Sequence, residues 1–467
     1  MSKYSGYMDK VAMLDLSTQE VKDYPWSDED REQYIGGRAM ASKIMSDCLK
    51  GNESALSEEN LIVITTGPLT GTGAPCSNHF NISALSPVTG AVTYSSCGGE
   101  FGYYLKKAGY DALVLTGKCA EHSWLDIYND SFILHNADRE EIWGNGVIKS
   151  QEAVREILDR DYGCRVKCGI VTIGIAGEEM RPYADVFSQE RVAGTHGGIG
   201  AVFGWKNLKA IAVAGNKRPT VANQEKLDAW HKKWIEATRK HALTAKQLPK
   251  LGMTAINTEA DHSHCVSCPI KCGVAEVEPK GEVDSERAEF GLLAGDVLAC
   301  DLKHSLLKMD ASDKLKSEFL FMMQNVLESI SATGQCTFTG LTALPSEGSV
   351  ESAVAKCMGK LSPFISFINK HPGIMFFPLS AFYHDREMKY ATGMKMNLGK
   401  YMRCGERGYT LEKYMQAIFG AECSCCCEDK EALEKLLKMY YALRSWSKEG
   451  VPTDATLKKL GIKKGSN

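Results

Sequence analysis

Long apolar runs, an excess of charge of one sign and a nucleotide P-loop are all missing from this sequence. No apolar run reaches about 18 residues, so no membrane helix is predicted. The first residues, MSKYSGYMDKVAMLDL, have no apolar core of signal-peptide length. Lys and Arg number 55 against 58 Asp and Glu, which leaves no electrostatic footprint for nucleic acid or an acidic membrane surface. The motif G-x-x-x-x-G-K-S/T is absent, so an ordinary nucleotide P-loop is not supported.

The sequence also lacks a regular disulfide framework, although it has 17 cysteines in 467 residues. The cysteines are irregularly spaced, and a chain of this length needs no disulfide staples. With no export signal, free thiols and metal or cluster ligation are favoured over disulfides. We therefore expect a cytoplasmic protein from a reducing or anaerobic setting.

The hydrophobic pattern of the chain changes near residue 215, and this change predicts an α+β fold in two parts. Residues 1–215 hold short apolar runs closed by Gly or Pro, which are typical of buried strands, and form the β-rich domain. Residues 216–467 show long helical periodicity and form a mostly helical region. At the junction, Pro219 is a breaker and Asn223 a candidate helix cap.

Three glycine-rich loops stand out in the first part, at residues 67–80, 86–118 and 191–213. Glycine permits positive φ and close approach of a ligand to the backbone. Successive backbone N–H groups in such loops can bind anions, and GGEFGYYLKKAG looks like a helix start that would add its positive end. Several such loops suit a large cofactor with phosphates, but tight turns in a β-rich domain would give the same composition.

Three cysteines in the stretch HSHCVSCPIKCG have the spacing C-x2-C-x3-C, at Cys265, Cys268 and Cys272. Three close cysteines plus a distant one are typical of a 4Fe–4S cluster. A structural zinc site using His262 or His264, or three unligated thiols, remain as alternatives. The candidates for the fourth ligand are Cys300, Cys336, Cys357, Cys404, Cys423, Cys425, Cys426 and Cys427. Cys336 follows a strong helical pattern at a glycine turn, SATGQC, and is favoured; the run at 423–427 is interpreted as incidental.

Several stretches together resemble the tungsten-containing aldehyde ferredoxin oxidoreductases. The N-terminal ones are YIGGRAMASKIM, TGPLTGTGAP, SPVTGAVTYSSCGGEFGYYLKKAGYDALVLTGK and RVAGTHGGIGAVFGWKNLKAIAV. The cysteine motif CVSCPIKCG is similar in type and spacing, and the tail CGERGYTLEKYMQAIFG to YYALRSWSKEGVPTDATLKKLGI resembles the family's C-terminal signature. The N-terminal resemblance is long and collinear.

This resemblance implies a 4Fe–4S cluster beside a tungsten (or molybdenum) bis-pyranopterin, with the N-terminal domain as the base on which the pterins lie. The pterin-binding positions it implies are Gly36, Gly37, Arg38, Ser77, Asn78, His79, Gly98, Gly99, Arg191, Ala193 and Gly194. The family often has an arginine at the position of His79. Arg191 is suited to phosphate because its guanidinium is permanently charged and bidentate. The implied cluster ligands are Cys265, Cys268, Cys272 and Cys336, and Glu289 falls at the family's active-site glutamate.

The sequence departs from the family in the segment that handles substrate. The family's D-x-x-G-L motif and the segment with its active-site histidine are not found between the cluster motif and Cys336. Ser331 replaces the aspartate of the second pterin motif, and Thr195-His196 interrupts the third glycine loop. The bridging metal motif of some family dimers is not visible either. The base domain and the cluster thus look retained, while the substrate half looks shortened.

Two functions follow from the resemblance. The first is an anaerobic oxidoreductase that oxidises or reduces an aldehyde or related carbonyl or acyl substrate at the metal pterin, with Glu289 as acid or base. Electrons would be exchanged with ferredoxin or an iron–sulfur partner subunit, and a homodimer is compatible with the family. The second is a catalytically degenerate member that serves as a 4Fe–4S electron-transfer or accessory subunit, or uses a different cofactor.

Overall fold

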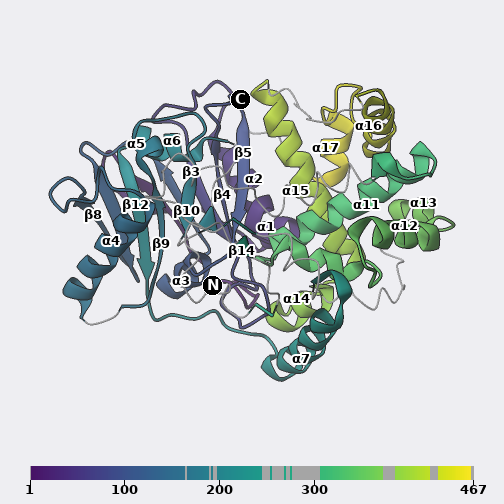
Figure 1. The fold of residues 1–467 in the computed structure, drawn as a ribbon, viewed down its shortest axis with the longest axis horizontal. Helices are drawn as coiled ribbons and strands as arrows, with labels where there is room; N and C mark the ends of the chain where they lie inside the picture. The colour runs from purple at the N-terminus through teal and green to yellow at the C-terminus, as the bar shows by residue number, and fades with distance from the viewer. Residues whose placement is uncertain are drawn as a thin grey trace.

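The computed structural model describes residues 2–163, 166–188, 191–192, 197–244, 253–254, 268–269, 274–275, 306–371, 384–420 and 430–463. Two six-stranded sheets form the first part of the molecule, and helices form most of the second (Figure 1). The predicted α+β class, with the sheets preceding the helices, is confirmed.

The first sheet has the strand order β2-β1-β6-β3-β4-β5. Strands β1 and β6 are parallel and all other neighbours are antiparallel. Strands β3, with the sequence IVITT, and β6, with the sequence ALVLT, are short apolar runs of the kind predicted for residues 1–215. Its strands are β1 (Val11–Asp15), β2 (Val21–Asp23), β3 (Ile62–Thr66), β4 (Phe80–Leu85), β5 (Val92–Cys97) and β6 (Ala112–Thr116).

The second sheet has the order β11-β10-β9-β12-β7-β8. Only β12 and β7 are parallel in it. Its strands are β7 (Ser123–Tyr128), β8 (Ser131–Asn136), β9 (Cys168–Ile173), β10 (Val186–Ser188), β11 (Arg191–Val192) and β12 (Leu208–Ala214). A short parallel pair, β13 (Met253–Thr254) and β14 (Val274–Ala275), lies outside both sheets.

The two faces of the first sheet belong to different apolar cores, which follows from the two-residue period of a strand. In β3, Ile62 and Ile64 share one core with Leu125 and Ile127 of the second sheet. Val63, between them, belongs to the other core, which includes residues of the helical part such as Ile330. The first sheet is therefore buried on both sides, against the second sheet and against the helices.

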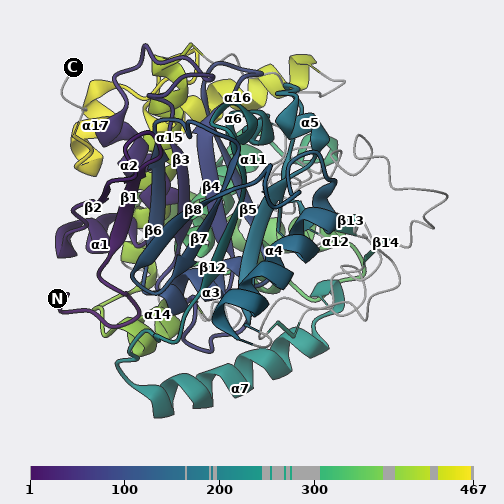
Figure 2. The same ribbon diagram turned by 90° about the vertical axis from the view of Figure 1, so that its left-hand side faces the viewer.

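Short helices complete the first part of the chain. Helix α1 begins with a capping box, because the Ser27 hydroxyl accepts from the Asp30 N–H and the Asp30 carboxylate accepts from the Ser27 N–H. Helix α4 covers the outer face of the second sheet (Figure 2). The helices are α1 (Asp28–Tyr34), α2 (Gly37–Cys48), α3 (Phe101–Ala108), α4 (Val147–Tyr162), α5 (Ile175–Glu178) and α6 (Ile199–Trp205).

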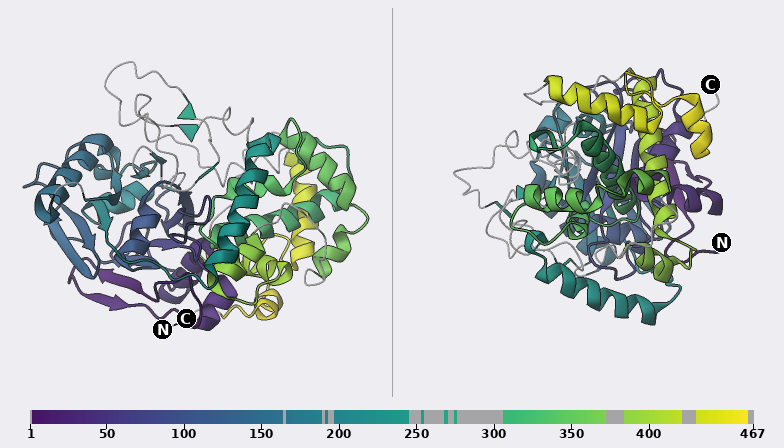
Figure 3. Two further views of the ribbon diagram at one scale, coloured as in Figure 1. Left: turned by 90° about the horizontal axis from the view of Figure 1, so that it is seen from below. Right: turned by 90° about the vertical axis from the view of Figure 1, so that its right-hand side faces the viewer.

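Helix α11 is the buried centre of the helical part, with α2, α15 and α16 packed around it (Figures 1 and 3). Its hydroxyls bond to neighbouring backbones: Ser329 donates to Tyr401 O at 2.6 Å and Ser317 to Leu436 O at 3.1 Å. The helices are α7 (Gln224–Lys240), α11 (Asp313–Ala332), α12 (Val350–Leu361), α13 (Ile365–Lys370), α14 (His384–Thr392), α15 (Leu398–Ile418), α16 (Lys430–Arg444) and α17 (Asp454–Leu460), with the 3₁₀ helix η2 (Thr337–Ala343).

The junction between the two parts contains the predicted helix cap. The side-chain oxygen of Asn223 accepts from the Lys226 N–H at 3.0 Å, and α7 begins at the next residue, Gln224. Pro219 lies in the irregular stretch that links β12 to this helix. Among the described helices, none is both long enough and apolar enough to cross a membrane.

Candidate cofactor site

The loop after β3 and the turn after α11 are held together by backbone hydrogen bonds, although the two segments are far apart in sequence. The Leu69 N–H donates to Thr333 O at 3.1 Å, and the His79 N–H donates to Gly334 O at 3.1 Å. The Cys336 N–H donates to Cys76 O at 2.9 Å. The structure thus places the first predicted glycine loop directly against the SATGQC turn that carries the predicted fourth cluster ligand.

Glycines permit this close approach. At Gly67 an added Cβ would overlap the backbone of Thr333 and Gly334, and at Gly37 it would overlap the carbonyl of Ser331. Gly37 also has φ +49°, in the left-handed region that favours glycine. Gly67 in the first predicted glycine loop and Gly37 at the start of α2 therefore let the backbone approach the end of α11 closely. A Cβ added at Gly36 would lie 2.9 Å from Thr66 O and 3.0 Å from Ala332 O.

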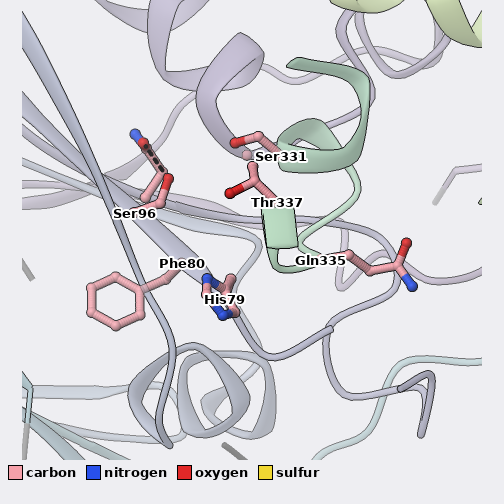
Figure 4. A pocket seen from close by; sticks show the side chains of 8 residues that line it. His79, Phe80, Ser96, Ser331, Gln335 and Thr337 are labelled. Atoms are coloured by element: carbon pink, nitrogen blue, oxygen red, sulfur yellow. Dashed lines mark hydrogen bonds between the residues drawn. The ribbon is translucent and has the colours of Figure 1, made fainter. Parts of the chain in front are cut away.

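A small pocket opens where these segments meet (Figure 4). Two predicted site residues, Gly37 and His79, line it. Ser331, which replaces the family's aspartate, lines it as well. The other lining residues are Phe80, Asn81, Ser96, Gln335 and Thr337. In Figure 4 the Ser331 and Thr337 hydroxyls lie across from Ser96, with the His79 imidazole below them.

Hydroxyl, amide and imidazole groups are among the groups that line this pocket, and none of its lining residues is acidic. Ser331, Thr337 and Ser96 carry hydroxyls that both donate and accept, and His79 offers a ring nitrogen. Ser96 is already linked to Asn81, to whose side-chain oxygen its hydroxyl donates at 3.4 Å. Both hydrogen-bond donors and hydrogen-bond acceptors are therefore present around the pocket.

Other predicted residues shape the loops rather than line the pocket. The Ser77 hydroxyl donates to Ala74 O at 2.7 Å, and the Asn78 side-chain oxygen accepts from the Gly71 N–H at 3.2 Å. Both side chains are buried and fold the loop back on itself. Gly98 and Gly99 connect β5 to α3, and Gly99 has φ +95°.

Arg38 lies between two buried carboxylates. Its Nη2 is 2.6 Å from Glu412 Oε1, and its Nη1 is 3.7 Å from Glu328 Oε1. The guanidinium also sits over the Tyr94 ring, 5.0 Å from its centroid. Arg38 therefore joins the start of α2 to α11 and α15. Its assignment to cofactor binding stays a prediction, because the structure compensates its charge with protein carboxylates.

The described cysteines at the site are Cys76, Cys268 and Cys336. Cys268, the middle cysteine of the predicted motif, has its Sγ 3.2 Å from the Sγ of Cys76. Cys336 is buried and bonded through its backbone to Cys76, as described above. The described residues alone include no set of three His, Cys, Asp or Glu side chains placed to hold a metal. Two predicted ligands, Cys265 and Cys272, lie outside the described residues.

Two alternative candidates for the fourth ligand are held as thiols by their surroundings. Burial raises the pKa of Cys357 to about 11 and that of Cys404 to about 11. The Cys404 thiol donates to Glu32 O at 3.4 Å. Without a bound metal, both groups are therefore neutral thiols at neutral pH.

Several other predicted positions lie wholly or partly outside the described residues. Arg191 forms β11 with Val192 and pairs with Ser188, but its side chain lies outside the described residues. The remaining ones are Ala193, Gly194, Glu289, Thr195, His196, His262, His264, Cys300, Cys423, Cys425, Cys426 and Cys427. Their roles stay predictions.

A buried polar chain that the sequence did not reveal lies behind the pocket. Gln335 Nε2 donates to Glu387 Oε2 at 2.7 Å, and Glu387 Oε1 is 2.9 Å from His231 Nε2. The other amide atom, Gln335 Oε1, is 2.6 Å from His384 Nδ1, which must donate because a carbonyl oxygen only accepts. This chain fixes the Gln335 amide, which lines the pocket and also donates to Pro75 O at 3.2 Å.

His384 makes the stability of the protein sensitive to acid. Complete burial lowers its pKa from 6.5 to about 3. In the unfolded chain it binds a proton below pH 6.5, whereas in the folded protein it stays neutral, so stability present above pH 6.5 is lost as the pH falls. The free-energy advantage of wild type over His384→Gln should shrink by about 2 kcal/mol between pH 7 and pH 5. Urea unfolding of both proteins measures it, and a difference that does not change with pH would contradict the prediction.

Comparison with protein families places both parts of the chain. The family model for the N-terminal domain of aldehyde ferredoxin oxidoreductase matches residues 11–215. The model for domains 2 and 3 of the same enzymes matches residues 299–462. Together the two family models match almost all of the first part of the chain and most of the second part.

Individual relatives share about a third of their residues with this chain over the aligned region. The tungsten-containing aldehyde ferredoxin oxidoreductase of Pyrococcus furiosus is 32% identical over 251 residues, 54% of this chain and 40% of that protein. The protein of the same name from Pyrococcus abyssi is 29% identical over 298 residues, 64% of this chain and 48% of its own. The WOR-like subunit of aliphatic sulfonate oxidoreductase from Pyrococcus furiosus is 32% identical over 234 residues, 48% of this chain and 37% of that protein. The chain spans less than half the length of these relatives.

A solved structure shares the whole fold. A chain of the active site complex BamBC of benzoyl coenzyme A reductase, in complex with 1,5-dienoyl-CoA, superposes with a TM-score of 0.70. The match covers 98% of this chain and 97% of that one at 18% identity, and so concerns the fold alone. Taken with the two family models, these findings show that the chain belongs to the aldehyde ferredoxin oxidoreductase family.

Proposed function

We propose that this chain is an oxidoreductase that holds a tungsten (or molybdenum) bis-pyranopterin beside a 4Fe–4S cluster. Its substrate would be an aldehyde or a related carbonyl or acyl compound, and electrons would pass to or from ferredoxin or an iron–sulfur partner subunit. One observation carries the proposal. The loop at 67–79 and the turn at 333–336 are hydrogen-bonded to each other, which brings the pocket-lining His79 and the proposed cluster ligand Cys336 into one place.

Described residues contribute to both proposed sites. Cys268 and Cys336 supply soft thiolates, which favour iron–sulfur clusters or zinc. Gly37, Ser331 and Thr337 line the small pocket, and the two hydroxyls would be hydrogen-bond partners for the edge of a pterin that lies beside it. When bound, the metal pterin would supply the redox chemistry and the cluster would carry the electrons. The protein's own task is to orient the substrate and move protons, for which Glu289 is the proposed acid or base.

The first experiment is metal analysis of the protein purified without oxygen. Tungsten or molybdenum near one per chain, with about four irons, is the expected result for a metal pterin and one 4Fe–4S cluster. Iron without either heavy metal would exclude the metal-pterin enzyme. Zinc without iron would exclude the cluster.

Replacing Cys268 by alanine is expected to remove most of the iron. Cys268 belongs to the cysteine motif, and its sulfur lies at the junction of the two loops, in contact with Cys76. Cys357→Ala is the control, because that thiol is buried in α12 and does not belong to the motif. Iron per chain and the electron paramagnetic resonance of the reduced protein provide the readout. Equal iron in wild type and Cys268→Ala would show that this motif does not hold the cluster.

A second function is favoured by the shortened middle of the chain. The family's D-x-x-G-L motif is not found between the cluster motif and Cys336, and Ser331 replaces an aspartate. An electron-transfer or accessory subunit would keep the cluster thiols without the substrate segment. It would hold iron but neither tungsten nor molybdenum, so the same metal analysis separates the two functions.

A further inference from the structure

Strand β8 forms an open edge of the second sheet. It is the last strand in the order of that sheet, and in the described part of the chain it pairs with β7 alone. Figure 1 shows it on the side of the molecule away from the helical part. Its sequence, SFILHN, contains no lysine, arginine, carboxylate or proline. Natural proteins protect an edge strand by making it short, by placing charges or proline in it, or by covering it.

The other three edges of the two large sheets carry such protection. Strand β2 has three residues, of which Lys22 and Asp23 are charged, and β11 has only two residues. Strand β5 is held by a helix, because Gln416 of α15 donates from its side chain to Val92 O at 3.3 Å. Within the described ranges, β8 is therefore the edge strand that is neither short nor bonded to a helix through its backbone.

The hydrogen-bond pattern of the β7–β8 hairpin shows which backbone groups face outward. Just beyond β8, the Ala137 N–H donates to His122 O at 2.8 Å. Hydrogen-bonded pairs alternate along an antiparallel ladder, so every second residue counted back from Ala137 also bonds to β7. The intervening residues direct their N–H and C=O groups away from β7. These residues are Phe132, Leu134 and Asn136.

The side chains of β8 leave an apolar group uncovered beside these backbone groups. Phe132 and Leu134 pack against the core between the two sheets. Ile133 points to the opposite face, as expected for neighbouring residues of a strand, and is 42% exposed. An open strand edge with an exposed apolar side chain is suited to binding a further strand.

We infer that β8 pairs in an antiparallel direction with β8 of a second copy of this chain, across a two-fold axis at Leu134. In a symmetric pair, outward-facing residues must lie opposite outward-facing residues. The register centred on Leu134 is the one that uses all three of them, with Phe132 opposite the partner's Asn136. On the other face, Ile133 would be covered by the partner's His135. This inference is independent of the proposed function, since it requires no cofactor.

The charges at the two ends of β8 favour this antiparallel arrangement. At the hairpin turn, Lys10 and Lys217 both pair with Asp130, at 2.9 Å and 2.8 Å, which leaves one positive charge in excess. At the other end, residues 138–141 contain three carboxylates and one arginine. Antiparallel pairing places the basic end of each copy beside the acidic end of the other, whereas parallel pairing would bring like ends together. The charged ends also enlarge the contact beyond the strand itself, which is only about 20 Å long.

Sedimentation of the full chain over a concentration series tests the inference. Wild type should form a dimer, and Ile133→Lys should raise its dissociation constant by about tenfold or more, because a lysine on the edge opposes strand pairing. Met439→Lys is the matched control. Met439 is 43% exposed and lies on α16 in the helical part, so this variant should dimerise as wild type does. A monomeric wild type, or equal dissociation constants for Ile133→Lys and wild type, would overturn the inference.

A charge reversal tests the direction of pairing. Lys10→Glu should raise the dissociation constant several-fold, because it turns the basic end acidic, and added salt should weaken the wild-type dimer. Lys435→Glu is the control, since Lys435 forms a comparable exposed ion pair with Glu431 at 2.7 Å but lies on α16. If Lys10→Glu and Lys435→Glu dimerise equally well, the antiparallel β8 pairing is wrong. Equal weakening by Ile133→Lys and Met439→Lys would place the interface elsewhere and would also overturn the inference.

Discussion

Replacing Asp111 by alanine should lower the free energy of unfolding by about 3–5 kcal/mol, because it leaves the buried Lys106 ammonium without its counter-charge. Lys106 is fully buried and forms an ion pair with Asp111. Burial lowers the pKa of Lys106, and the Asp111 carboxylate opposes that shift. The same carboxylate accepts from the backbone N–H groups of Met8 and Asp9, at 3.0 Å each. One substitution therefore removes an ion pair and two charge-assisted hydrogen bonds.

The loss should extend to the candidate site. The Asp111 carbonyl accepts from the Thr66 N–H at 2.9 Å and from the Thr66 hydroxyl at 2.8 Å. Thr66 ends β3, and Gly67 begins the loop that meets residues 333–336. If the backbone around residue 111 loses its structure, both hydrogen bonds from Thr66 to the Asp111 carbonyl are lost. We therefore expect Asp111→Ala to reduce iron content as well as stability.

Urea unfolding of Asp111→Ala and Asp130→Ala provides the test. Asp130 pairs with Lys10 and Lys217, but its side chain is 60% exposed, and exposed pairs contribute about 0–1 kcal/mol. The double variant Lys106→Met/Asp111→Ala should recover part of the loss, because it removes the unpaired charge. If Asp111→Ala and Asp130→Ala are equally stable, the buried ion pair contributes no more to the free energy of unfolding than the exposed pairs do.

Local sequence signals predicted the parts of the fold that depend on short-range chemistry. The run LKAIAVA is β12 because its alternate residues fill two cores, and Asn223 caps α7 because an amide oxygen can reach the first free N–H groups of a helix. The helix and strand types follow from residues that are close in sequence.

Contacts between distant segments could not be predicted in this way. Arg38 is 374 positions from Glu412, and no periodicity or motif indicates their ion pair. The chain from Gln335 to Glu387, His231 and His384 likewise joins three segments through single polar residues. Cys76 did carry a signal, since it is a cysteine inside a loop predicted to bind the cofactor, but its partner is revealed only by the folded structure.

Gly67→Ala should separate the two segments that form the candidate site. A Cβ at this position would overlap the backbone of Thr333 and Gly334, and backbone atoms cannot turn aside as the end of a side chain can. The loop would have to move, which breaks the bond from Leu69 N–H to Thr333 O and displaces His79 from the pocket. Overpacking of this kind costs about 1–3 kcal/mol and more where the backbone must shift. We expect lower thermal stability and lower content of iron and of tungsten or molybdenum.

The effect of Gly67→Ala can be separated from that of any glycine substitution in the same loop. Gly73 has φ +88° and nothing within 4 Å of an added Cβ, so Gly73→Ala should cost only the roughly 1–2 kcal/mol of a left-handed alanine and leave the metals bound. Gly359 lies in α12 with open space around it, so Gly359→Ala should stabilise the helix by about 0.5–1 kcal/mol. Thermal unfolding and metal analysis of the three variants decide the matter. Of these three glycines, only Gly67 faces the turn at residues 333–336. Metal loss confined to Gly67→Ala would therefore locate the cofactor at this junction. Equal metal content in all three variants would place the cofactor elsewhere.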